Sequence, residues 1–389
     1  MHPAKRILLV HNAYSHPGGE DVVFSNERQL LTDHGLDVRV FAASNTTLSG
    51  LFGKLLAGAG AVFSVSAYVR LRRSLRAWRP DVVHVHNFFP KISPSVFYAC
   101  RAEGVPVVLT LHNYRIVCPT ETLLHNGIVT ERSLTEGPWW GVRERVYRTS
   151  FAATFILAVM ISVHRRIGTW QSKVDRFIVP SQFGCKKFIE AGLPAGKICH
   201  KPNFANAPSA RSLPRDGLLY VGRLSKEKGV EVMAMAGTDL AGPIKIAGDG
   251  PLKERLAQQQ NIVHLGWLGF DRVREEMARA VAVVVPSVCY ETFGLAVVEA
   301  FSTGTPVLAS NIGALSELVE DGVTGLLVNP NDVSDLRDKM QWALANKSAM
   351  SSMGNVALNR FRQLYARDPN FERLMAIYQD AIDSLSGAH

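Results

Sequence analysis

Short apolar runs alternate with longer amphipathic segments along this chain, and the alternation occurs twice. In the first half the apolar runs are Ile7–Val10, Val38–Phe41, Val82–His86, Val107–Leu111 and Arg176–Val179. After Lys201-Pro202-Asn203 they resume, as Leu218–Val221, Ile244–Ala247, Ile262–Leu265, Val281–Pro286, Val307–Ser310 and Gly325–Val328. Helices are predicted between them, for example over Leu252–Gln259 and Phe293–Thr303. This alternation is typical of α/β proteins with parallel sheets covered by helices.

The length of the chain indicates two domains. At 389 residues it exceeds one ordinary core, and it suits two α/β domains of about 150–200 residues each. We therefore predict two Rossmann-like domains facing across a cleft, over 1–200 and 201–367, followed by a helical tail over 368–389. In open sheets of this kind ligands bind at the carboxyl ends of strands, where most of the candidate residues below are expected.

Positive charge is concentrated in the first half. Residues 1–200 contain 24 lysines and arginines against 13 acidic residues, whereas residues 201–389 contain 19 against 21. No nucleic-acid-binding motif accompanies the excess, so an anionic membrane surface is the expected partner. The five cysteines are scattered and none form a C-x-x-C pair, and the N-terminus runs straight into a strand. These features predict a cytoplasmic protein with no zinc site and no secretory signal.

Two segments bear on that membrane contact. Val65–Arg79 combines five arginines with apolar residues that loosely share a helical face. It is expected either to lie peripherally on anionic lipid, at the inner face of the membrane, or to be an ordinary surface helix. Phe151–Val163 is apolar for only 13 residues. That length is too short to span a bilayer, so a buried helix is predicted, with shallow membrane contact as the alternative.

Two glutamates flank a glycine-containing turn in the segment PSVCYETFGLAVVE, residues 286–299. Glu291 and Glu299 have seven residues between them, and Thr292-Phe293-Gly294-Leu295 is the predicted entry to a helix. Free amides at a helix N-terminus suit an anion such as a diphosphate. At about 1.5 Å per residue, Glu299 lies roughly 6–8 Å further along the helix. One carboxylate can face a group bound at the helix end and the other a group beside it, which suits a nucleotide sugar.

A second charged element, GRLSKEKG at residues 222–229, directly follows the first strand of the second half. Arg223 and Lys228 straddle a turn and can approach one anion from two sides. A planar guanidinium and a mobile ammonium suit a diphosphate whose charge grows as it leaves. A solvated loop is the alternative, and the position between a strand and a helix argues against it.

The first half places histidines at its strand ends. His84 and His86 belong to one strand, and alternation directs both to the same face. We expect His86 and Asn87 to line the ligand cleft and His84 to be a core histidine. Metal binding by the two histidines is the alternative, but the sequence shows no third ligand clustered with them.

Together, the charged motifs of the second half resemble the signature of retaining glycosyltransferases of the GT-B fold, group 1 (family 4). The resemblance covers most of the chain, and its specific motifs lie between Gly222 and Gly325. It implies that Arg223 and Lys228 hold the donor's phosphates. It also implies that Glu299 binds the ribose and Glu291 the transferred sugar.

The same resemblance assigns further contacts. A glycine loop after the first strand meets the nucleotide sugar, a histidine lies near the donor sugar, and backbone groups hold the base. The catalytic set that follows is Arg223, Lys228, Glu291 and His112. The donor-binding set is Gly18, Gly19, Gly222, Trp267, Leu268, Thr292, Phe293, Gly294, Leu295 and Glu299.

The expected reaction is transfer of a hexose from a nucleotide diphosphate sugar to a hydroxyl group, with retention of configuration. The first domain would bind the acceptor, a lipid-linked or membrane-associated glycan in cell-surface polysaccharide synthesis, and the second the donor. The tail either crosses back to the first domain, as in GT-B enzymes, or packs on its own. No DxD triplet is evident, so no metal cofactor is expected. The alternatives are a nucleotide-sugar epimerase, a glycogen- or sucrose-type synthase, and a non-catalytic nucleotide-sugar-binding subunit.

Overall fold

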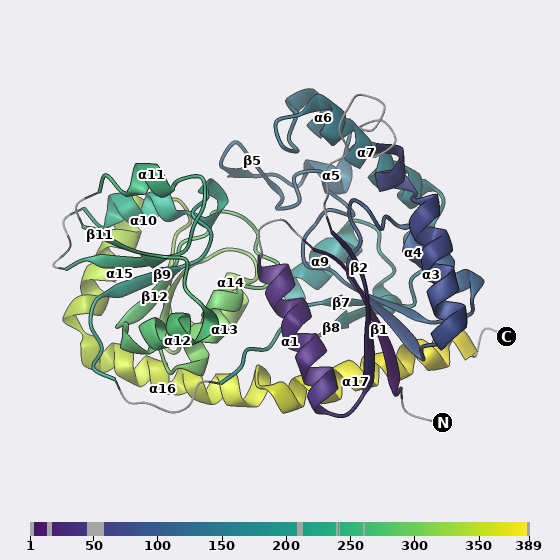
Figure 1. The fold of residues 1–389 in the computed structure, drawn as a ribbon. Helices are drawn as coiled ribbons and strands as arrows, with labels where there is room; N and C mark the ends of the chain where they lie inside the picture. Colours follow the sequence, from purple (N-terminus) through teal and green to yellow (C-terminus); the bar gives the residue numbers. More distant parts are fainter. Residues whose placement is uncertain are drawn as a thin grey trace. The chain divides into compact units, whose positions relative to one another are not determined.

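The chain divides into two compact units, each built on a six-stranded parallel sheet (Figure 1). The structure, a computed structural model, describes residues 4–13, 18–44, 58–207, 213–238, 240, 242–259 and 261–386. Unit 1 comprises residues 1–123, 130–201 and 370–389, and unit 2 comprises residues 124–129 and 202–369. The predicted α/β fold class is thus confirmed.

In unit 1 the strands follow the order β2-β1-β3-β4-β7-β8. Their bounds are β1 Arg6–Ala13, β2 Asp37–Ser44, β3 Val82–Asn87, β4 Val107–Thr110, β7 Arg176–Val179 and β8 Ile198–His200. The helices are α1 Gly19–Asp33, α3 Val65–Trp78, α4 Ser95–Ala102, α5 Arg132–Thr135, α6 Trp140–Glu144, α7 Phe151–Arg166, α8 Thr169–Ser172 and α9 Gln182–Glu190. β3 and β4 are buried along their whole length, as expected of strands with both faces covered.

The last helix, α17 (Arg367–Ser386), completes the core of unit 1. Its buried residues Leu374, Tyr378 and Ala381 belong to the same apolar cluster as Ile7 of β1 and Val82 of β3. The amphipathic pattern of the tail is therefore satisfied against the first sheet, about 370 positions away along the chain from Ile7. Arg176 of β7 also pairs with Asp380, with Nε 2.5 Å from the carboxylate.

In unit 2 the strand order is β11-β10-β9-β12-β13-β14. The bounds are β9 Leu218–Val221, β10 Ile244–Ala247, β11 Ile262–Gly266, β12 Ala282–Val285, β13 Val307–Ser310 and β14 Gly325–Val328. The helices are α10 Val230–Ala236, α11 Lys253–Leu256, α12 Phe270–Arg279, α13 Leu295–Ser302, α14 Leu315–Leu318, α15 Val333–Ala345 and α16 Lys347–Leu364. A short hairpin, β5 Leu124–His125 with β6 Ile128–Val129, groups with this unit.

Two predicted helices are shorter in the structure. The helix predicted over Leu252–Gln259 is only the single turn α11, because Leu256 is buried while the polar residues after it are exposed. The helix predicted from Phe293 begins at Leu295, because Gly294 has φ +108°, which a helix does not accept. Within the described residues, no helix is both long and apolar enough to cross a membrane.

Candidate active site

The charged motifs of unit 2 meet at the carboxyl ends of two neighbouring strands. The GRLSKEKG segment follows β9, and the PSVCYET segment follows β12, which pairs with β9 in parallel. Strand order reverses between these two strands, since β10 and β11 lie on one side and β13 and β14 on the other. In open α/β sheets this switch point is where ligands bind.

Gly229 allows the two segments to approach. It has φ +67°, and a Cβ built on it would lie 1.8 Å from the carbonyl oxygen of Pro286. The Val288 amide also donates to the Glu227 carbonyl at 3.0 Å. A side chain at position 229 would force the loops apart, so the glycine fixes how closely the cation of one motif approaches the acid of the other.

Lys228 and Glu291 form an ion pair where the two segments meet. The ammonium lies 2.6 Å from Glu291 Oε1, and Ser287 Oγ donates to the same oxygen at 2.7 Å. Burial alone would raise the pKa of Glu291, but Lys228 and the Ser287 hydrogen bond outweigh it and hold that pKa below its ordinary value. Burial would lower the pKa of Lys228, and Glu291 more than offsets this and raises it. Both groups are therefore charged at neutral pH.

The turn between the two glutamates ends in a helix N-terminus. Gly294 caps α13 in a left-handed conformation, and a Cβ there would lie 2.7 Å from Leu315 Cδ2. Phe293 is buried in the core of the unit, while Thr292 and Leu295 are half-buried beside it. The first amides of a helix have no carbonyl partner within it, so this end can take an anionic group.

Glu299 lies one turn into α13, with the opposite electrostatic character to Glu291. Burial raises its pKa to about 7, and Arg274 only partly counters this effect. The two glutamates are thus distinct: one is paired with a cation, and the other is desolvated.

The remaining unit 2 candidates lie at neighbouring strand ends. Gly222 directly follows β9, and the Arg223 side chain is exposed. Trp267 directly follows β11 and is 73% exposed, with Leu268 half-buried next to it. These residues lie directly after strands, where the sequence motifs predicted them. Their contacts with a ligand stay predictions.

Unit 1 has its own polar pocket at the carboxyl ends of β3 and β4. Its lining includes Glu20, His86, Asn87, His112, Asn113 and Arg115. Glu20 Oε1 accepts from Asn113 Nδ2 at 2.6 Å. Burial lowers the pKa of His112 to about 4, so its imidazole is neutral at pH 7. The pocket therefore offers uncharged nitrogen, amide and carboxylate groups, the usual partners of sugar hydroxyls.

The glycine loop lies at the start of α1. Gly18 is its N-cap, and the Gly18 amide donates to Asp21 at 2.8 Å. Asp21 also lies 2.8 Å from His11 Nε2. A Cβ on Gly18 or Gly19 would meet nothing within 4 Å. Within the protein itself, packing does not require glycine at either position.

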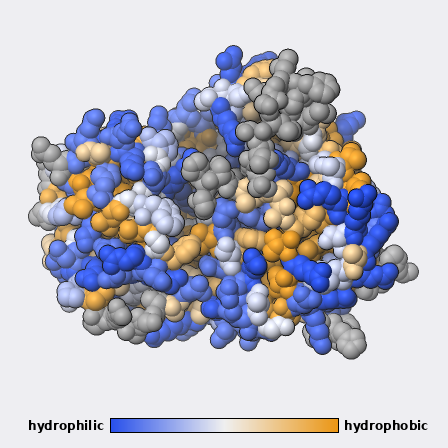
Figure 2. Space-filling view, in the orientation of Figure 1, coloured by the Kyte–Doolittle hydropathy of each residue, from blue (hydrophilic) through white to orange (hydrophobic). Residues whose placement is uncertain are grey.

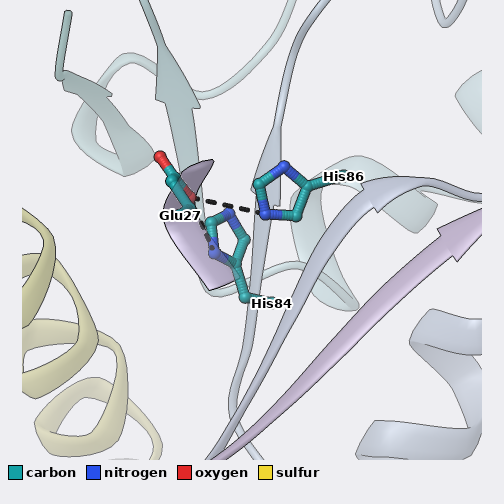
Figure 3. A group of neighbouring side chains, drawn as sticks. All are labelled: Glu27, His84 and His86. Atoms are coloured by element: carbon teal, nitrogen blue, oxygen red, sulfur yellow. Dashed lines mark ion pairs between the residues drawn. The ribbon is translucent and has the colours of Figure 1, made fainter. Parts of the chain in front are cut away.

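The structure supplies the third group that the sequence did not place beside the two histidines. Figure 3 shows the Glu27 carboxylate facing both His84 and His86. Glu27 Oε2 lies 3.6 Å from His84 Nδ1 and 3.4 Å from His86 Nε2. His84 is buried and bonded at both ring nitrogens, to Tyr378 and Thr110, which is the core role expected of it.

Glu27 and Arg115 were not identified from the sequence. The sequence pattern could have indicated Glu27, because this acidic residue occupies an apolar position on α1, between buried Val23 and buried Leu30. No such pattern indicates Arg115: it lies in a loop, where it bonds Glu121 at 2.6 Å and approaches Asn87 at 3.4 Å. Loop residues of this kind are positioned by tertiary contacts alone.

Two Rossmann-like units, with a cation–carboxylate pair beside a helix N-terminus, are the arrangement expected of a GT-B glycosyltransferase. Residues 17–207 match the family described as Glycosyltransferase Family 4, and residues 215–346 match Glycosyl transferases group 1. The chain belongs to this family and is a glycosyltransferase.

Individual relatives have varied activities. The chain is 30% identical over 349 residues to a glycogen synthase of Mycobacterium tuberculosis, covering 83% of this chain and 75% of the relative. It is 24% identical to the alpha-D-kanosaminyltransferase of Streptomyces kanamyceticus, covering 86% and 85%.

Solved structures share the fold at low identity. Sucrose-phosphate synthase of Thermosynechococcus elongatus has a TM-score of 0.72 at 19% identity, covering 96% of this chain and 98% of that one. Anabaena HepE in complex with UDP and glucose has a TM-score of 0.67 at 18% identity, covering 99% and 100%.

Proposed function

We propose that this protein transfers a sugar from a nucleotide diphosphate sugar to a hydroxyl acceptor, with retention of the anomeric configuration. The observation that carries the proposal is the Lys228–Glu291 pair at the switch point of the second sheet, 2.6 Å apart beside the N-terminus of α13. A cation, a free helix end and an acid at one place suit the phosphates and the sugar of such a donor.

The roles follow from the chemistry of each group. Arg223, Lys228 and the first amides of α13 would stabilise the leaving diphosphate as its charge grows. Glu299 would accept hydrogen bonds from two ribose hydroxyls, and Glu291 would bind hydroxyls of the transferred sugar. With these groups in place, the departing phosphate itself can take the acceptor's proton on the same face of the sugar, so no protein nucleophile is required.

The relatives support this donor class. HepE has been crystallised with UDP-glucose, and the relatives named above include synthases and transferases of sugars. The base and the sugar are best found with a panel of UDP-, GDP- and ADP-sugars, since a bound donor raises the unfolding temperature by mass action.

Arg223→Ala and Lys228→Ala test the assignment directly. Loss of either cation should lower the rate of nucleotide diphosphate release at least about a hundredfold, because charge-assisted contacts to the leaving group act in the transition state. Lys226→Ala is the matched control, as Lys226 lies in the same loop and is exposed. Near-normal rates in both variants would overturn the proposal.

Product analysis separates the alternatives. A glycosyltransferase yields a glycosylated acceptor or free sugar together with nucleotide diphosphate, whereas an epimerase releases a modified sugar and a binding subunit releases nothing. NMR of the first product formed gives the anomeric configuration. We also propose that no metal cofactor is needed, so that EDTA leaves the rate unchanged.

The acceptor is proposed to be a lipid-linked or membrane-associated glycan for cell-surface polysaccharide, reached from the cytoplasmic face. The basic half of the chain supports this, although α3 cannot insert its apolar side, because Ala67, Leu71 and Leu75 are buried. Arg72 and Arg76 are also held by Glu103. The outward side of α3, which carries the exposed arginines together with Val65 and Val69, is available to lipid headgroups.

Exposed aromatic residues on α7 and directly before α6, in the same unit, add an apolar contact. Trp139 and Phe155 lie 5.8 Å apart, Phe151 stacks on Phe155 at 6.3 Å, and all three are exposed. In Figure 2 hydrophobic and hydrophilic residues adjoin on the side of the unit where α3 and α4 lie. Aromatic residues beside arginines are typical of proteins that bind an anionic membrane interface.

Liposome co-sedimentation tests this surface. Binding to vesicles with anionic lipid should fall strongly when Arg70, Arg73 and Arg79 become glutamine, and again when Phe151 and Phe155 become serine. Arg255→Gln, Arg272→Gln and Arg362→Gln together, all at exposed positions of unit 2, serve as the charge-matched control. Unchanged binding in both surface variants would exclude this face.

A further inference from the structure

A buried polar network lies inside unit 1, beneath the pocket that contains His112. Lys201 Nζ lies 2.6 Å from Glu27 Oε1, and the two side chains are 0% and 1% exposed. The other carboxylate oxygen, Oε2, faces His84 and His86 (Figure 3). Burial favours the neutral acid, but Lys201 and His86 outweigh it and keep the pKa of Glu27 below its ordinary value.

The charges of this network disfavour a metal ion. One ligand atom each of Glu27, His84 and His86 lie within 4.8 Å of one another, a spacing that a divalent cation could bridge. Lys201 already neutralises the carboxylate, so a divalent cation would add two uncompensated positive charges in a fully buried place. His84 Nδ1 is also engaged with Tyr378 Oη at 2.8 Å. A buried ion pair beside two imidazoles, rather than a metal centre, fits these contacts. Within the described residues, Glu27 Oε2 and His86 Nε2 face each other with no hydrogen-bond partner.

The network reaches the pocket through His86. Its Nε2 lies 3.4 Å from Glu27 Oε2, and its Nδ1 lies 3.1 Å from His112 Nε2. The rings of His86 and His112 are stacked, with centroids 5.3 Å apart. Burial lowers the pKa of both imidazoles, so each is neutral and carries one ring proton at pH 7. The network can therefore determine which ring nitrogen of each imidazole carries that proton.

The carboxylate determines which nitrogen of His86 carries the proton. A lone pair on Nε2 would face an anionic oxygen 3.4 Å away between two fully buried side chains, whereas an N–H there is attracted to it. With the proton on Nε2, His86 Nδ1 is an acceptor. His112 Nε2 must then be the donor across the 3.1 Å contact, and His112 Nδ1 carries the lone pair.

We propose that Glu27 is a positioning residue which, through His86, fixes the tautomer of His112, so that His112 Nδ1 accepts a hydrogen bond from a sugar hydroxyl of the substrate. The substrate part rests on the proposed function, while the tautomer follows from the contacts in unit 1 alone. Lys201 maintains the arrangement by holding the other carboxylate oxygen.

Glu27→Gln should reverse the tautomer. Because Lys201 requires an acceptor, the amide oxygen of glutamine takes the position next to Lys201, and the amide NH2 then faces His86 Nε2. His86 Nε2 becomes the acceptor, its Nδ1 donates to His112 Nε2, and His112 carries its proton on Nδ1. The rate constant kcat should fall about tenfold to a hundredfold, the effect of one misdirected buried hydrogen bond, with little change in KM for the donor.

The test is NMR at pH 7 on the full chain labelled with ¹⁵N-histidine, with the His112 signals assigned through His112→Gln. The native protein should show the Nε2–H tautomer at His112, and Glu27→Gln the Nδ1–H tautomer. Tyr378→Phe, which removes a partner of His84 instead, should leave His112 and kcat unchanged. If Glu27→Gln fails to fold, the uncharged pair Glu27→Leu with Lys201→Met should give a mixture of tautomers.

Each outcome has one meaning. An Nε2–H tautomer retained at His112 in Glu27→Gln overturns the inference, whatever the activity. Stoichiometric metal in the purified protein that is lost in Glu27→Gln also overturns it. A tautomer change in a protein that releases no nucleotide diphosphate supports the relay and removes the proposed function instead.

Discussion

At the scale of single residues, the role proposed for Glu299 predicts that donor binding depends on pH. Burial raises its pKa from the ordinary 4.5 to about 7, so below pH 7 the carboxyl group is largely protonated in the folded protein. A protonated group is a poorer acceptor for two ribose hydroxyls. Donor affinity should therefore rise as the pH increases from 6 to 8.

Calorimetry with an intact nucleotide sugar checks this, since its diester phosphates do not titrate in that range. Glu299→Gln, which cannot ionise, should bind weakly with no pH dependence over the same interval. The free energy of unfolding should change in the opposite direction to donor affinity. The raised pKa of Glu299 favours the folded state at low pH, and that contribution is lost as the pH rises through 7. An equally steep binding profile in the variant would assign the titration to another group.

Single residues also mark how far the sequence could predict the site. Lys228 and Glu291 could be predicted as neighbours because each lies within a short motif with fixed spacing, and the structure places their charged atoms 2.6 Å apart. Glu27 and Lys201 are 174 positions apart, and their pairing depends on α1 and the residue directly after β8 meeting in the folded unit. No local pattern encodes such a contact, although a carboxylate on the apolar side of α1 indicates a buried partner.

At the scale of elements, the approach of two loops in unit 2 depends on Gly229. Alanine there incurs the left-handed backbone cost, about 1–2 kcal/mol, and also a clash with the Pro286 carbonyl at 1.8 Å. Gly229→Ala should lower the unfolding temperature and separate Lys228 from Glu291, with loss of activity. Gly35→Ala is the matched control, because it has φ +77° with nothing within 4 Å of its Cβ.

Thermal unfolding and nucleotide diphosphate release measure the two effects. Gly35→Ala should lose stability by the backbone cost alone and keep its activity. If Gly229→Ala matches that control in both measurements, the loop contact is unimportant for the site.

How well each helix or strand could be predicted from the sequence depends on the length of its apolar pattern. Strands such as Arg176–Val179 and Leu218–Val221 were predicted to the residue, because apolar runs flanked by turns have few alternatives. β8 was missed: Ile198–His200 has three residues and an exposed end, so it carries almost no apolar signal. The helix predicted from Phe293 begins two residues later, at Leu295, because the left-handed conformation of Gly294 cannot belong to the helix.

At the scale of the whole molecule, α17 tests whether unit 1 needs the end of the chain. Leu374 is fully buried against the first sheet, so Leu374→Ala should destabilise unit 1 by about 2–5 kcal/mol. Hydrogen exchange can localise the effect. Amide protection should fall in β1 of unit 1 and stay unchanged in β9 of unit 2.

Glu372→Ala, at an exposed position of the same helix, is the control and should change neither strand. Equal loss of protection in β1 and β9 would mean that the two units unfold together.

The return of α17 to the first sheet also has a consequence during synthesis. Unit 1 includes the first residues of the sequence, yet Leu374 and Tyr378 leave the ribosome only after all of unit 2 has been synthesised. Until then the side of the sheet that these residues cover is open and prone to aggregation, while unit 2 is already able to form. A stop codon directly after unit 2 should therefore release a protein with an intact unit 2 and an exposed, aggregation-prone unit 1.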